Sequence, residues 1–213
     1  MQYDVRPPDP RPADAPEVSL DDPLVQALAH VHVTGWRQAY GDLLPERYYD
    51  EAARADRARM WQSTLMHDHA SDRVRIAART DRTTSQADST ASQSDTTVSQ
   101  SATPASQLDS TVSQSATPAD DEVIGFSIHG PARDDDRTGT ELFALYVLQE
   151  HYGSGAGQRL LDAAIGDSPA CLWAAAENPR ALRFYEKNGF RPDGVRRTDA
   201  DADGLEEIRL VRE

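Results

Sequence analysis

The chain has 213 residues, about one and a half times the usual length of a domain, which favours one domain plus an appendage. Apolar residues make up 38% of it, below the ~45–50% of an average globular domain, so some stretch does not help to build a core. The 36 acidic and 22 basic residues give a net charge of -14, which excludes a protein that coats DNA or RNA.

The sequence predicts no membrane-spanning helix, no signal peptide and no disulfide. The sequence has no run of about eighteen apolar residues, and MQYDVRPPDP lacks the basic and then apolar order of a signal peptide. The single cysteine, Cys171, cannot form an intrachain disulfide or a cysteine metal cluster. Histidine pairs spaced i, i+2 point to different faces of a helix, so we expect no metal site. These features predict a soluble, cytoplasmic protein.

The first part of the chain predicts one strand, two helices and a second strand. Asp22 and Pro23 have the pattern of a helix start, in which a carboxylate cap precedes a proline in the first turn. Alternating apolar and polar residues predict half-buried strands just before and after a repetitive segment rich in Ser and Gln. The predicted elements are a strand at Tyr3–Arg6, helices that follow Asp22 and Pro45, and strands at Val74–Ala77 and Val123–Ile128.

Between the last two strands lies a repeat of five seven-residue units, each beginning Ser-Gln, from Ser85 to Ala119. A coiled coil is disfavoured because Ser and Thr compete for backbone hydrogen bonds, and Pro104 and Pro118 would break a helix. Such a segment buries too little surface to offset its chain entropy, so residues 82–121 are predicted to be a disordered insertion in a loop. A modification tract and a docking arm are the functional alternatives.

The second part of the chain alternates strands and helices. A dense apolar strand is followed by a glycine-rich turn and a helix, and a second buried strand by a helix that Asn178 caps and Gly189 ends. The predicted strands are Glu141–Leu148, Cys171–Ala174, Phe190–Arg197 and Glu206–Val211. The order of elements predicts an α+β fold with a mixed sheet.

Gly153, Gly155 and Gly157 stand between a strand and a helix, where backbone N–H groups and the helix N-terminus can bind a pyrophosphate. No Gly-Lys-Ser/Thr follows, so this is not the phosphate loop of the nucleotide triphosphatases. A tight strand-to-helix connection without a ligand is the alternative.

Two segments, LYVLQEHYGSGAGQRLL and NPRALRFYEKNGF, closely resemble the sequence signatures of the GNAT superfamily of acetyl-CoA-dependent N-acetyltransferases. The resemblance covers Glu141 to about Arg197, and HVHVTGWRQAYGDLLPERYYDE is similar to N-terminal regions of that family. It implies a mixed, mostly antiparallel seven-stranded sheet flanked by about four helices, with the repeat in the loop between the second and third strands. Residues 1–81 and 122–213 would then form one domain, the latter part being the acetyl-CoA-binding core.

The resemblance implies acetyl transfer from acetyl-CoA, as co-substrate, to a primary amine of a small molecule or peptide in a ternary complex. The backbone of Leu145, Tyr146 and Val147 would pair with the pantetheine arm, and Asn178 would contact it. Tyr185 would be the general acid, since a tyrosine of pKa ~10 is protonated at pH 7 and can donate to a thiolate of pKa ~8.5. The backbone amides expected to hold the pyrophosphate are those of Gly153, Ser154, Gly155, Ala156 and Gly157.

Two positions carry open questions. The family usually has Gln or Arg three residues before Gly155, where this chain has Tyr152, so the loss of a side-chain contact should weaken cofactor binding modestly. Glu141, at the start of a strand, is either the base that deprotonates the amine through water or a solvated strand-end carboxylate.

The function has two competing interpretations from other classes. One is a non-catalytic acyl-CoA-binding module, which would have no need of Tyr185. The other is an interaction protein that works through its repeat, which would not need the glycines. The acceptor pocket is expected between the first two helices and the strand ends, near Trp36, Tyr40 and the loop after Gly130. The acceptor itself and a homodimer are left open.

Overall fold

The computed structural model describes residues 2–10, 17–80 and 121–213. The Ser-Gln repeat and its predicted disorder lie outside these described residues. The strands on either side of it, β2 and β3, pair antiparallel, as expected for a hairpin. No helix in the described part of the chain is long and apolar enough to cross a membrane.

Seven strands form one sheet in the order β1-β2-β3-β4-β5-β7-β6. Every neighbouring pair is antiparallel except β4 and β5, which run parallel. The predicted seven-stranded, mostly antiparallel sheet is therefore confirmed. The strands are β1 (Gln2–Arg6), β2 (Val74–Thr80), β3 (Glu122–Pro131), β4 (Thr140–Val147), β5 (Ala170–Ala175), β6 (Arg191–Asp199) and β7 (Leu205–Arg212).

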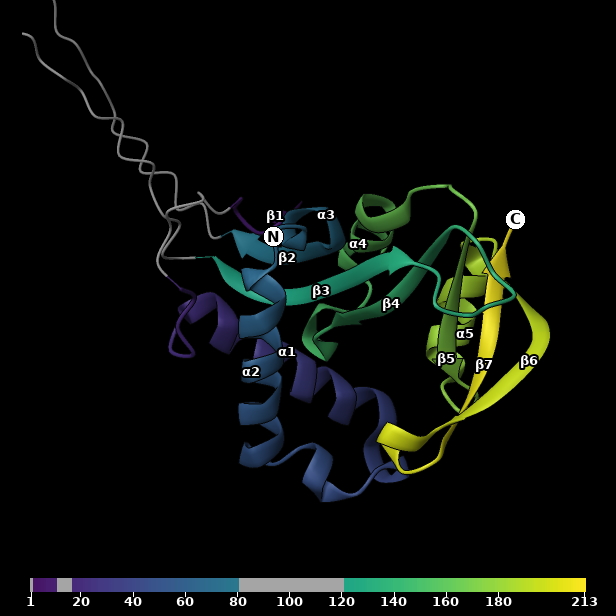
Figure 1. Ribbon diagram of the computed structural model, residues 1–213, viewed down its shortest axis with the longest axis horizontal. Helices are drawn as coiled ribbons and strands as arrows, with labels where there is room; N and C mark the ends of the chain where they lie inside the picture. The colour runs from purple at the N-terminus through teal and green to yellow at the C-terminus, as the bar shows by residue number, and fades with distance from the viewer. Residues whose placement is uncertain (1, 11–16, 81–120) are drawn as a thin grey trace, which may run out of the picture.

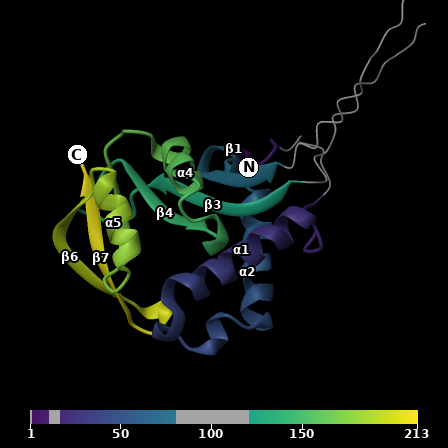
Figure 2. The same cartoon turned by 180° about the vertical axis from the view of Figure 1, so that it is seen from behind.

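Helices cover both faces of the sheet, with α1 and α2 against one face and α4 and α5 against the other (Figures 1 and 2). Neighbouring residues of a strand point to opposite faces, and β2 shows this directly. Ile76 packs with α1 and α2, whereas Ala77 packs with α4. The helices are α1 (Pro23–Tyr40), α2 (Glu51–Met66), α3 (Ala70–Arg73), α4 (Ala156–Ile165) and α5 (Pro179–Lys187).

The helix ends follow the capping residues. The Asp22 carboxylate accepts a hydrogen bond from Leu24 N at 2.8 Å, so the predicted start of α1 is confirmed. The second helix does not begin directly after Pro45: a short 3₁₀ turn, Glu46–Tyr48, comes first, and Asp50 caps α2. The side chain of Asp50 accepts from the amide of Ala53, which makes it the stronger start signal. The one-turn helix α3 was not predicted, because four residues are too few for a periodic pattern.

The parallel pair β4 and β5 separates soon after it forms. Only Thr140, Glu141 and Leu142 of β4 have partners on β5, although both strands continue beyond that point. The register between β3 and β4 also shifts here and skips Phe143. An extra residue of this kind bends its strand, so the bulge lies where β4 turns away from β5.

The helix pair α1 and α2 seals the N-terminal half of the core around Trp61 of α2. Its side chain is fully buried, and its ring meets that of Phe126 on β3 edge-on at 4.7 Å between centroids. Aromatic pairs in this geometry add to the free energy gained by burial alone. Trp61 therefore joins the helix layer to the sheet.

We expect Trp61→Ala to lower the free energy of unfolding by about 3–5 kcal/mol, because it leaves a cavity between α2 and β3. Met66→Ala is the matched control on the same helix, since Met66 is 44% exposed. The control should change stability by less than ~0.5 kcal/mol. Urea denaturation of both variants checks this, and equal effects would contradict the placement of Trp61.

Candidate functional site

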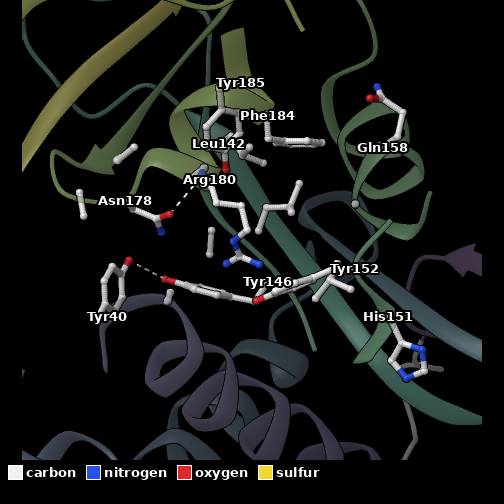
Figure 3. Close-up of a pocket in the computed structure, with 18 of the residues that line it drawn as sticks. Tyr40, Leu142, Tyr146, His151, Tyr152, Gln158, Asn178, Arg180, Phe184 and Tyr185 are labelled. Atoms are coloured by element: carbon white, nitrogen blue, oxygen red, sulfur yellow. Dashed lines mark hydrogen bonds between the residues drawn. The ribbon is translucent and has the colours of Figure 1, made fainter. Parts of the chain in front are cut away.

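A cavity of about 470 Å³ lies where β4 and β5 separate, and residues of β4, β5, α5 and the glycine turn line it (Figure 3). Its volume is within the ~300–1,000 Å³ of typical ligand pockets. The cavity exists because the two parallel strands are no longer bonded beyond Leu142 and Leu172. The edge of β4 that faces β5 therefore has backbone groups available to a ligand.

The predicted pantetheine-binding strand lines this cavity. Leu145, Tyr146 and Val147 are all among its lining residues. Two glycines allow close packing around Tyr146. A Cβ on Gly125 would meet the carbonyl oxygen of Tyr146 at 2.6 Å, and one on Gly35 would meet the Tyr146 side chain at 3.1 Å. The two glycines therefore let the end of β4 lie close to α1 and β3.

The glycine turn forms one end of the cavity. Gly153 and Gly155 have φ angles of 76° and 87°, and Gly155 is the N-cap of α4. Residues with side chains rarely adopt these angles, and no atom lies within 4 Å of where their Cβ would stand. The backbone here is therefore open to a ligand at the N-terminus of a helix, where N–H groups favour an anion.

Not every residue of the turn reaches the cavity. Gly157 lines it, whereas Ser154 and Ala156 do not. The hydroxyl of Ser154 accepts a hydrogen bond from Ala156 N at 3.3 Å, and Ala156 is fully buried between α4 and the sheet. For Ser154 and Ala156 the predicted contacts with a ligand stay predictions.

Asn178 caps α5 and also lines the cavity. Its side-chain oxygen accepts from Ala181 N at 3.0 Å, so the capping role is confirmed. The oxygen is used by the cap, which leaves the amide N–H groups to meet a ligand. The predicted contact with the pantetheine arm stays a prediction.

Tyr185 projects from α5 into the cavity (Figure 3). Its side chain is buried and packs edge-on against Phe184 and Phe190. Burial raises the pKa of the Tyr185 hydroxyl above its ordinary value, the charge of Arg180 acting in the opposite, lesser direction. The hydroxyl therefore keeps its proton at neutral pH and is a donor at the wall of the cavity.

A pair of tyrosines also lines the cavity. The hydroxyls of Tyr40 on α1 and Tyr146 on β4 lie 3.1 Å apart, and both residues line the cavity. Burial raises the pKa of Tyr146 well above its ordinary value. Of the two residues expected near the acceptor pocket, Tyr40 lines the cavity and Trp36 does not.

Glu141 is not brought to the cavity. Its side chain is 1% exposed, and it is not a lining residue. Arg133 holds both carboxylate oxygens: its backbone N–H donates to Oε2 at 3.0 Å and its guanidinium to Oε1 at 2.5 Å. The solvated strand-end alternative does not fit this burial. The role of catalytic base stays a prediction, and the visible role is to anchor the β3–β4 loop.

Sequence reasoning missed Arg180 and Trp173, which also line the cavity. The guanidinium carbon of Arg180 lies 3.8 Å from the centre of the Tyr152 ring. A cation in the first turn of α5, two residues after the cap Asn178, was the available signal. Trp173 lies mid-strand in β5 and gives no such signal.

The chain matches the family model described as "Acetyltransferase (GNAT) domain" over residues 116–192. A Mycobacterium tuberculosis protein named "Probable N-acetyltransferase" is 39% identical over 77 residues, which are 34% of this chain and 43% of the relative. A second protein of that organism, named an uncharacterized N-acetyltransferase, is 32% identical over 102 residues, 44% of this chain and 62% of the relative. The chain thus spans about half the length of these relatives.

Solved structures share the whole fold at low identity. A Pyrococcus horikoshii protein has a TM-score of 0.57 at 14% identity, covering 100% of this chain and 98% of its own. The PaiA N-acetyltransferase of Thermoplasma acidophilum, in complex with coenzyme A, has a TM-score of 0.54 at 15% identity and covers 100% and 99%. Residues 116–192 are thus similar to a GNAT acetyltransferase domain, and the chain shares its fold with these solved structures, including the sheet that divides between β4 and β5.

Proposed function

We propose that this protein is an N-acetyltransferase that moves the acetyl group of acetyl-CoA to a primary amine of a small molecule or peptide. The observation that carries the proposal is one cavity that runs from the open glycine turn, along the unpaired edge of β4, to the hydroxyl of Tyr185. Its three parts suit the three parts of the co-substrate: a phosphate cradle, a strand edge for the amides of the arm, and a proton donor for the sulfur.

The arm would lie in the place that a further strand would take beside β4. The residues from Phe143 to Val147 pair with β3 on one side only, apart from the bulge. Amides of the pantetheine arm can use the other side as a strand partner would, which orients the thioester toward Tyr185. The low polarity of the walls, with Leu145, Phe184 and Ala174, excludes water from the reacting carbonyl.

Acetyl transfer forms a C–N bond to the amine and breaks the C–S bond of the thioester. One proton must therefore leave the amine nitrogen and one must reach the sulfur. The proton of the amine would leave to solvent water, and Tyr185 Oη would donate the second proton to the sulfur and be reprotonated from solvent. The raised pKa keeps the Tyr185 hydroxyl protonated at neutral pH but also makes it a weaker acid, so transfer to a thiolate of pKa ~8.5 needs the sulfur to lie within hydrogen-bond reach of the hydroxyl.

The domain organisation and location belong to the same proposal. Residues 1–81 and 122–213 would form one catalytic domain, and residues 82–121 a tolerated insertion in the β2–β3 loop. The cost of closing a longer loop grows only logarithmically with its length, so a fold can carry such a segment. The cytoplasm, where acetyl-CoA and primary amines are both available, is the proposed location.

Acetyl-CoA should raise the Tm of the protein, because a ligand that binds only the native state stabilises it. We expect Gly155→Val to abolish this shift, since a branched side chain would cover the N–H groups of the turn. Gly139→Val is the matched control: Gly139 also has a positive φ, of 99°, but does not line the cavity. A Tm shift that persists in Gly155→Val would place the phosphates elsewhere.

Tyr185→Phe should lower turnover about 10²–10⁴-fold and leave the Kd for acetyl-CoA nearly unchanged, because it removes the proton donor and keeps the ring. Release of free thiol across a panel of amines measures turnover, and calorimetry measures binding. A variant within a few-fold of the wild type would show that water protonates the thiolate. No turnover with any amine by a wild-type protein that binds acetyl-CoA would favour the non-catalytic acyl-CoA-binding module.

Glu141→Gln separates its two roles. Because Arg133 engages the buried carboxylate, we expect the variant to lose about 1–3 kcal/mol of stability while its pH–rate profile keeps the wild-type shape. Arg133→Gln, which removes the partner, should destabilise the same loop. A profile whose acidic limb flattens in Glu141→Gln, but not in Arg133→Gln, would instead establish Glu141 as the base.

A further inference from the structure

The walls of the cavity carry a marked asymmetry of charge. Among the described residues that line it, Arg180 is the one arginine or lysine, and no aspartate or glutamate takes part. This is unusual for a chain with 36 acidic and 22 basic residues. A cavity that excludes carboxylates and keeps one guanidinium suits an anionic ligand.

We propose that Arg180 binds the diphosphate of coenzyme A from the α5 side, and that the ring of Tyr152 holds its guanidinium in place. The assignment rests on the proposed function. It gives Arg180 a part in cofactor binding and gives Tyr152 a positioning role through its ring.

The geometry brings the two residues together across the cavity. Tyr152 precedes the glycine turn, and Arg180 stands in the first turn of α5, on another wall (Figure 3). The guanidinium carbon is 3.8 Å from the centre of the Tyr152 ring, well inside the ~6 Å limit for a cation–π interaction. The figure shows the Arg180 side chain running from α5 into the cavity toward Tyr152.

Arg180 has its hydrogen-bonding capacity free. It forms no ion pair or hydrogen bond with any described residue, whereas Arg133, Arg197 and Arg209 are each paired with carboxylates. A guanidinium stacked on a ring by its face still presents its N–H groups at its edge. Its planar fork matches two phosphate oxygens, which makes arginine a strong phosphate ligand.

The contact between Arg180 and Tyr152 lies next to the glycine turn. Tyr152 stands three residues before Gly155, where the resemblance implies a Gln or Arg. Its absence was expected to weaken cofactor binding. The structure brings a cation to that place from α5 instead. The N–H groups at Gly153 and Gly155 approach a diphosphate from the turn, and Arg180 would approach it from the opposite wall. The expected loss of affinity would thereby be offset.

The test compares Arg180→Gln with Arg183→Gln, a control on the same helix with the same change of charge at an exposed residue that does not line the cavity. Three probes are titrated by calorimetry: acetyl-CoA, its 3′-dephospho form and S-acetylpantetheine. We expect Arg180→Gln to raise the Kd for the two diphosphate-containing probes about 10- to 100-fold and to leave that for S-acetylpantetheine unchanged. Arg183→Gln should leave all three unchanged.

Tyr152 gives a second, graded readout. Tyr152→Phe should keep the wild-type Kd for acetyl-CoA because it keeps the ring, whereas Tyr152→Ala should weaken binding by part of the Arg180→Gln effect. In the double variant the two effects should not add, since both act through one guanidinium. Added salt should weaken acetyl-CoA binding more in the wild type than in Arg180→Gln.

Each other outcome overturns a defined part of the inference. An unchanged Kd in Arg180→Gln would show that Arg180 binds no phosphate. An effect confined to acetyl-CoA, absent for the 3′-dephospho form, would assign it to the 3′-phosphate, and an equal loss for S-acetylpantetheine would make it part of the arm's wall. A wild-type protein that binds none of the three probes would overturn the proposed function itself.

Discussion

The site depends on one constraint, the early separation of two parallel strands. β4 and β5 share only three residue pairs, and the bulge at Phe143 bends β4 away at that point. Backbone groups that leave a sheet must find other partners or water, because a buried and unpaired amide is costly. Here they face a cavity of about 470 Å³. The fold thus leaves one strand edge unsatisfied, and a ligand that carries amides of its own is what such an edge can bind.

The two helix layers keep that separation open. On one face, α1 can pack closely against β4 because Gly35 has no side chain to meet that of Tyr146. The hydroxyls of Tyr40 and Tyr146 lie 3.1 Å apart. On the other face, α5 carries Tyr185 and Asn178 to the opposite wall. The core that stabilises the protein is therefore also the frame that sets the width of the cavity. Burial is what raises the pKa of Tyr185, so packing and proton donation are linked.

A network of ion pairs around Arg209 lies outside the cavity. Arg209 is 4% exposed and is paired with Asp134, Asp136 and Asp193, which ties the β3–β4 loop to β6 and β7. Asp134 also accepts from Trp173 Nε1 at 3.1 Å, and Trp173 lines the cavity. A buried cation needs carboxylate partners, because an uncompensated charge in the interior is costly, so this network specifies the position of the loop. Carboxylates are thus gathered outside the cavity, which leaves Arg180 without a competitor inside it.

Features under local control could be predicted from the sequence alone: the caps at Asp22 and Asn178, the alternation that marks β2 and β3, and the glycine turn. Each of these signals is contained in a few neighbouring residues, so it can be recognised without knowing the fold. The resemblance to the GNAT superfamily added the seven-stranded sheet. The pairing of Glu141 with Arg133 outside the cavity, and the contact of Arg180 with Tyr152, became visible only in the folded chain. The partners in these pairs are 8 and 28 residues apart, on elements whose contact depends on how β4 bends and where α5 docks. Burial and long-range pairing are properties of the packed chain, and no local pattern encodes them.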